Sequence, residues 1–96
     1  MNPQRGEVAL DIGGETRTLC LTLGALAEIE QALGCESLRD LSVRLKAISA
    51  RDLQILLAAL LRGGGETDAA AGLDGLSIRP PEAVAAVLAC FRGAVA

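Results

Sequence analysis

The stretch that decides the fold is EVALDIGGETRTLCLTLGALAEIEQALG, residues 7–34, because strand-like alternation gives way to helical spacing within it. The alternating apolar positions of its first part are Val8, Leu10, Ile12, Leu19 and Leu21. The pair Gly13 and Gly14 separates the two runs and predicts a hairpin, because a two-residue turn of the primed type needs positive φ. We therefore predict a β-hairpin over residues 7–21, with Val8 opposite Leu19 and Leu10 opposite Arg17.

The second part of this stretch predicts a helix that ends before Gly34. Thr22 is placed to cap its N-terminus, and Gly34 stands where helices commonly end in the left-handed conformation. The apolar stripe consists of Ala25, Leu26, Ile29 and Leu33. Glu28 points away from this stripe and Glu30 flanks it, so the two carboxylates do not converge as an acid/base pair would require.

Helical spacing continues along the rest of the chain. Ser37 is expected to cap a helix through Ile48, and SARD, residues 49–52, has the form of a capping signal for a helix that runs to about Arg62. The cluster GGGE, residues 63–66, is interpreted as a flexible breaker, with Thr67 as the cap of a short turn or helix. The expected stripe of the closing helix is Val84, Val87, Leu88 and Phe91.

These elements predict an α+β fold, in which an N-terminal β-hairpin packs on a bundle of about four mostly short α-helices. We expect one domain over residues 1–96, since a chain of this length buries roughly two-thirds of its unfolded surface in one core. The expected parts are a hairpin (7–21), a helical core (22–62), a flexible link with a short helix (63–80) and a closing helix (81–93).

The composition argues against several classes of function. The chain has no histidine, nine basic against twelve acidic residues, and Phe91 as its one aromatic residue. The usual general base at neutral pH is therefore missing, and so are the basic face and the aromatic rings with which proteins bind nucleic acids. We expect no enzyme activity, cofactor or metal site, and we expect the three cysteines to be reduced and mostly packed.

The apolar runs and the start of the chain bear on location. The apolar runs fall short of the roughly 20 residues that a membrane-spanning helix needs. The first residues, MNPQRGE, carry no apolar region typical of a signal peptide. We therefore expect a cytoplasmic protein that does not enter the membrane.

The run from RGEVALDIGGETRTLCLTLGALAEIEQALG through SLRDLSVRL to SARDLQILLAALLRGGG resembles a small family from tailed phages and gene transfer agents. This family is classed with phage tail assembly chaperones, and some of its members are described as tail tube proteins. The resemblance covers about residues 5–65 and is weaker beyond Glu66. Its motifs are packing motifs, so no catalytic residue is carried over.

The resemblance implies an assembly factor in the cytoplasm of a bacterial host. Such chaperones coat the tape-measure protein while tail-tube subunits polymerise around it, so the tape-measure protein is the expected partner and the major tail protein a second candidate. A tape measure is largely helical with apolar stripes, which a small helical module could cover by helix-in-groove packing. Aliphatic area left on the surface also leaves self-association open.

The predicted partner surface uses residues that lie off the core stripes. Its apolar members are Val43, Ile55 and Ala59, and its basic rim consists of Arg39, Arg44 and Arg51. Two alternatives remain open at this point. One is a structural subunit of the tail tube or of the tail end. The other is a small DNA-binding regulator, suggested by the consecutive helices over residues 37–62 but disfavoured by the acidic charge balance.

Overall fold

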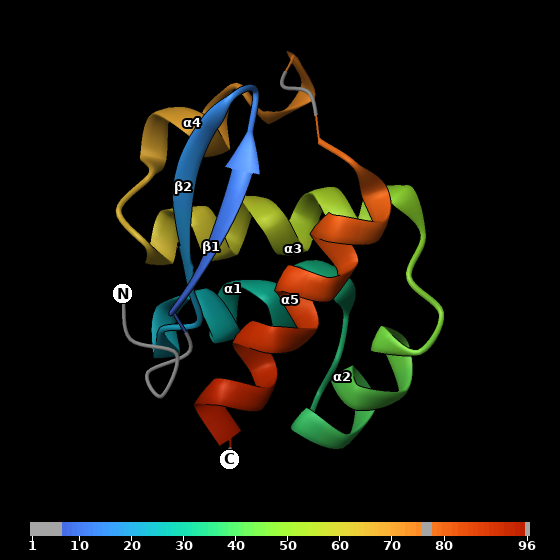
Figure 1. The fold of residues 1–96 in the computed structure, drawn as a ribbon. Helices are drawn as coiled ribbons and strands as arrows, with labels where there is room; N and C mark the ends of the chain where they lie inside the picture. The colour runs from blue at the N-terminus through green and yellow to red at the C-terminus, as the bar shows by residue number, and fades with distance from the viewer. Residues whose placement is uncertain (1–6, 76–77, 96) are drawn as a thin grey trace.

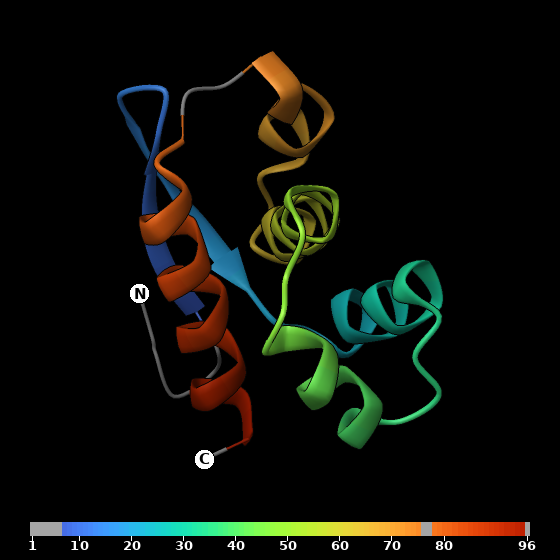
Figure 2. The same cartoon turned by 90° about the vertical axis from the view of Figure 1, so that its right-hand side faces the viewer.

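The computed structural model describes residues 7–75 and 78–95 of the chain. Its elements are β1 (Glu7–Ile12), β2 (Glu15–Cys20), α1 (Leu23–Leu33), α2 (Leu38–Leu45), α3 (Ala50–Gly63), α4 (Thr67–Ala71), the 3₁₀ turn η2 (Leu73–Gly75) and α5 (Pro80–Val95). The hairpin and α5 lie on one side of the molecule and α1 to α4 on the other (Figures 1 and 2). The predicted α+β fold with an N-terminal hairpin is confirmed. None of the described helices is long and apolar enough to cross a membrane.

The hairpin forms in the predicted register. Val8 pairs with Leu19 and Leu10 with Arg17, and the turn glycines have φ of 61° and 85°. One face of the hairpin carries Leu10, Ile12 and Leu19, all of which are buried. Because two strands alone are marginal in water, the helices that cover this face hold the hairpin in place.

The helix caps predicted for α1 and α2 are present, but α2 is shorter than expected. The Thr22 hydroxyl accepts a hydrogen bond from the Ala25 amide, and Gly34 ends α1 with φ of 71°. Helix α2 ends at Leu45, three residues before the predicted end at Ile48. The reason is that Ser49 adopts an extended conformation, with ψ of 166°, to cap α3, so the chain must leave the helix before it.

Helix α3 is the central element. It contacts β2, α1, α4 and α5, so elements from both sides of the molecule pack on it. Its buried apolar residues are Leu56, Leu57, Ala59, Leu60 and Leu61. Leu53 is only partly buried, because it faces an open groove described below.

The segment Gly63–Glu66, which we call the GGGE latch, fastens the end of α3 to β2 rather than serving only as a breaker. A Cβ atom on Gly64 would lie 2.8 Å from the Thr18 carbonyl carbon and closer still to its oxygen, and one on Gly63 would collide with the Cys20 carbonyl. The Glu66 carboxylate accepts a hydrogen bond of 2.9 Å from the Thr18 amide. Helix and strand therefore approach so closely that only glycine fits between them.

The latch also corrects the prediction for the next helix. Thr67 is the first residue of α4 and not its cap, and the cap position belongs to Glu66, which makes no side-chain cap hydrogen bond. Its carboxylate is directed instead to the Thr18 amide and, at 3.3 Å, to the Arg17 guanidinium. The predicted link over residues 63–80 thus contains the latch, α4 and η2, and residues 76–77 of it lie outside the described part.

The buried stripe of helix α5 shares only Val87 with the predicted one, and the helix is longer than predicted. It begins at Pro80 and continues through Gly93 to Val95. Its buried residues are Ala83, Ala86, Val87 and Cys90, whereas Val84, Leu88 and Phe91 are only partly buried. Small side chains face β1 and α3 because the helix packs closely on them, and the larger residues flank that contact.

Candidate functional site

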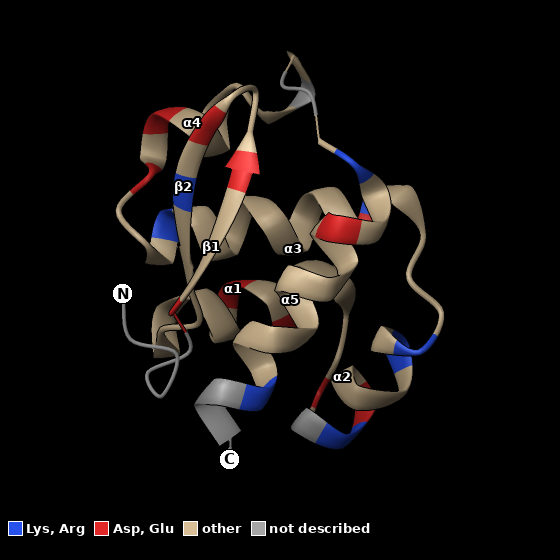
Figure 3. Cartoon of the chain, viewed as in Figure 1, with Lys and Arg blue, Asp and Glu red and all other residues tan. Residues whose placement is uncertain are grey.

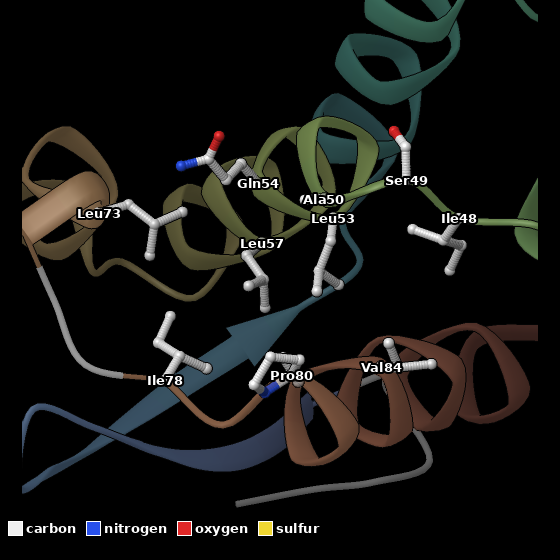
Figure 4. A pocket seen from close by; sticks show the side chains of 11 residues that line it. Ile48, Ser49, Ala50, Leu53, Gln54, Leu57, Leu73, Ile78, Pro80 and Val84 are labelled. Carbon is white, nitrogen blue, oxygen red and sulfur yellow. The ribbon is translucent and has the colours of Figure 1, made fainter.

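An apolar groove with a volume of about 500 Å³ lies between α3 and α5. We call it the α3–α5 groove; its lining residues are Ile48, Ser49, Ala50, Leu53, Gln54, Leu57, Leu73, Ile78, Pro80, Ala83 and Val84. In Figure 4 the side chains of Leu53 and Leu57 point across it toward the wall formed by Ile78, Pro80 and Val84. None of the lining residues is charged, so the groove offers contact almost entirely to apolar groups.

The local sequence explains why apolar side chains are left uncovered there. Helix α3 has more apolar residues around its circumference than its neighbours can cover, and its N-terminal half extends past the hairpin. On the facing wall Pro80 starts α5 and Val84 follows one turn later, on the flank of the helix rather than on its buried stripe. The groove therefore runs along roughly two turns of α3, from Ala50 to Leu57.

A second, smaller hollow of about 360 Å³ lies on the other flank of α3. We call it the α1–α4 hollow; its lining residues are Glu28, Ala32, Gln54, Ile55, Ala58, Arg62, Ala70, Ala71 and Leu73. Gln54 and Leu73 line both recesses, so the groove and the hollow lie on either side of one exposed strip of α3.

An ion pair borders this hollow. The Arg62 guanidinium donates to both carboxylate oxygens of Glu28. This hydrogen bonding raises the pKa of Arg62. The pair joins α1 to the end of α3, so its role here is to hold two helices together.

The structure separates the apolar residues of the predicted partner surface. Val43 is exposed on α2, with 64% of its surface accessible, and it lines neither recess. Ile55 is partly buried and lines the α1–α4 hollow. Ala59 is 0% exposed on the core side of α3, so a partner cannot contact it. Ala59 is therefore not part of the partner surface. The prediction for Ala59 was wrong because this side of α3 faces α1.

The three arginines of the predicted rim also differ in their surroundings. Arg39 and Arg51 are exposed. Arg44 instead ties three helices together, since its Nε donates to Asp52 Oδ2 and its Nη1 to the Leu33 carbonyl at the end of α1, both at 3.1 Å. The hydrogen bond from Arg44 also lowers the pKa of the Asp52 carboxyl. Arg44 is therefore part of the packing between helices and not of a rim.

The described part of the chain contains no cluster of side chains suited to metal binding and no reactive buried thiol. Over residues 7–75 and 78–95, no group of three or more acidic or cysteine side chains is placed to hold a metal ion. Cys90 is fully buried, and burial raises the pKa of its thiol to about 12, so it remains protonated at neutral pH. We take the groove and the hollow as the candidate sites, because both leave apolar side chains of α3 open to contact with a protein segment.

Comparison with models of protein families gives a match. A family model described as "Phage tail tube protein, GTA-gp10" matches residues 5–96. The match includes α4 and α5, where the resemblance in the sequence was weaker. No curated protein and no solved structure gives a significant match.

Proposed function

The chain belongs to the GTA-gp10 phage tail tube protein family, and on this premise we propose that it is a tail assembly chaperone that holds an apolar helical segment of the tape-measure protein. In this proposal it works in the host cytoplasm, without a cofactor and without catalysing a reaction. The family match supports a role in a phage or gene transfer agent tail; the groove supports the more specific role.

The observation that carries the proposal is the uncharged α3–α5 groove. A helix with an apolar stripe binds well to such a groove, because each apolar side chain that leaves water contributes and no buried charge has to be desolvated. Leu53 and Leu57 on α3 already lie across the groove from Val84 on α5. A preformed recess lowers the cost of ordering on binding.

A second candidate function is a structural subunit of the tail tube, and the description of the family as tail tube proteins favours it. Tube proteins are usually rich in β-structure, since they polymerise through sheets. The described residues form one sheet of two strands and five α-helices, which favours the chaperone over the tube subunit.

Co-expression with the tape-measure protein of the same tail gene cluster tests the proposal. We expect the wild-type chain to keep the tape-measure protein soluble and to co-purify with it. Val84→Asp places a carboxylate in the groove and should abolish co-purification, whereas Arg92→Glu, on an exposed residue outside the groove, should not. Circular dichroism of each variant checks that the fold is intact, and Ile48→Asp serves if Val84→Asp does not fold.

Mass spectrometry of purified particles separates the two candidates. A chaperone should be absent from finished particles, and a tube subunit should be among their abundant proteins. A tape-measure protein that is equally soluble with and without this chain would refute the chaperone.

A further inference from the structure

The surroundings of the α3–α5 groove are electrically asymmetric along its length. Figure 4 shows Leu73 and Ile78 at one end of it and Ile48 and Ser49 at the other. The second end is where α2 leads into α3, and this corner of the molecule carries several basic residues (Figure 3). The asymmetry restricts what kind of helix the groove can accept.

The basic residues at this corner are an exception in an acidic chain. The net charge of the chain is −3, yet residues 39–51 contain four basic residues and one acidic residue, Asp40. Of the four, Arg44 is neutralised by Asp52. The other three are exposed and form no ion pair with any described residue: Arg39, Lys46 and Arg51.

Two of these unpaired cations are close in the sequence to residues that line the groove. Lys46 stands two residues before the lining residue Ile48, and Arg51 directly follows Ala50. On the opposite wall Arg79, beside Pro80, is paired with Glu82 at 3.5 Å, so its charge is balanced. Among the described residues that neighbour the groove in the chain, the unpaired positive charge is therefore at the Ile48 end.

We infer that the α3–α5 groove takes a partner helix whose apolar stripe ends in a cluster of carboxylates, and that this acidic end lies beside Lys46 and Arg51. This inference rests on the proposed function, since it takes the groove as the docking site for the tape-measure protein. Exposed ion pairs add little affinity each, but complementary charge fixes the register and direction of a helix that apolar contacts alone would leave free to slide. A helix with a basic end at this position is disfavoured by repulsion.

Designed peptides test the inference directly. Two helical peptides of about 15 residues share one leucine stripe and an alanine and glutamine remainder, and they end in three Glu or in three Lys. Fluorescence anisotropy measures their binding at about 50 mM and about 300 mM salt. We expect the Glu-ended peptide to bind about tenfold more tightly at low salt, and the difference to shrink at high salt.

Three variants localise the effect. The double variant Lys46→Glu with Arg51→Glu should reverse the preference, and Val84→Asp should abolish binding of both peptides. Arg92→Glu is the matched control, because Arg92 is also exposed and unpaired among the described residues but lies near the other end of α5. If Arg92→Glu shifts the preference as much as the double variant does, net charge explains the effect and the inference is overturned.

Two further outcomes overturn it as well: equal binding of the two peptides to the wild-type chain, and no binding of either. The co-purification experiment distinguishes these results from failure of the proposed function. If the tape-measure protein co-purifies and Val84→Asp releases it while the peptides are not discriminated, only the charge inference fails. If the peptides are discriminated but the tape-measure protein is not retained, the inference about the groove holds and the proposed function fails.

Discussion

The substitution Gly64→Ala tests the contact between the end of α3 and β2. An added Cβ would lie 2.8 Å from the Thr18 carbonyl carbon, whereas ordinary van der Waals contact begins at 3.4 Å. The latch and the strand would therefore have to separate by at least 0.6 Å, and by more to clear the carbonyl oxygen. The atom that must give way is backbone in a paired strand, so it has little freedom to move.

Overpacking of this kind costs about 1–3 kcal/mol of unfolding free energy. Separation also weakens the hydrogen bond from the Thr18 amide to Glu66, which acts in the same direction. Without the contact, Gly64→Ala would be close to neutral or stabilising, because alanine has less conformational entropy to lose than glycine. The sign of the change is therefore diagnostic. Urea denaturation followed by circular dichroism measures it, and each kcal/mol should lower the melting temperature by roughly 4–8 °C.

Two glycines supply controls for steric and conformational effects. Gly65 has φ of 82° and open space around its Cβ position, so Gly65→Ala should cost about 1 kcal/mol through backbone strain alone. Gly75 has open space and no positive φ, so Gly75→Ala should change stability by less than about 0.5 kcal/mol. A Gly64→Ala protein as stable as the wild type would refute the close packing of the latch on β2.

Two other groups give predictions that depend on ionisation. The pKa of Glu66 is lowered, first by the hydrogen bond from the Thr18 amide and then by Arg17, so its stabilising effect is present above the ordinary value of 4.5 and is lost as pH falls through the lowered value. In urea titrations at several pH values, Glu66→Gln should therefore destabilise the protein at pH 7, and the gap to wild type should close in acid; a gap independent of pH would contradict this. Burial raises the pKa of Cys90 to about 12, so iodoacetamide near pH 8 should label partly exposed Cys35 well before Cys90, unless denaturant is added. Mass spectrometry of tryptic peptides reads this order, and early labelling of Cys90 would show that α5 opens readily.

The elements that the sequence predicted well are those defined by local signals. The hairpin register followed from a glycine pair that allows only one tight turn, and Thr22 and Gly34 fixed α1 because caps act within a few residues. Such signals need no knowledge of the neighbouring elements. The bounds of α3 were predicted to within one residue for the same reason.

The errors arose where a distant segment decides the outcome. The GGGE latch was interpreted as a breaker because nothing near Gly64 in the sequence indicates that Thr18 lies against it. In α5 the prediction favoured large residues such as Leu88, whereas close packing on β1 selected the small face that includes Ala86. The spacing of apolar residues along a helix does not show how closely that helix will approach a neighbouring strand.

The candidate site shows the same limit. An excess of apolar residues around α3 was visible in the sequence and indicated a surface for a partner. The second wall of the groove could not be predicted from the sequence. Its residues Ile78 and Val84 come from a segment more than twenty residues away in the chain and belong to no recognisable motif. Likewise, Arg44 could be recognised as a cation off the apolar stripe, but not as the residue that binds Asp52 and the end of α1.

The hydrogen bond between Thr18 and Glu66 has a consequence for strand addition. In a hairpin whose turn is closed by Ile12 and Glu15, Thr18 is a residue whose backbone groups point outward, and the latch occupies that edge of β2. A third strand could therefore join only at β1. Antiparallel pairing of two β1 strands about Ala9 would set Glu7 of each copy against Asp11 of the other, and like charges directly opposite one another are destabilising. The hairpin therefore disfavours edge-to-edge pairing of two copies through β1.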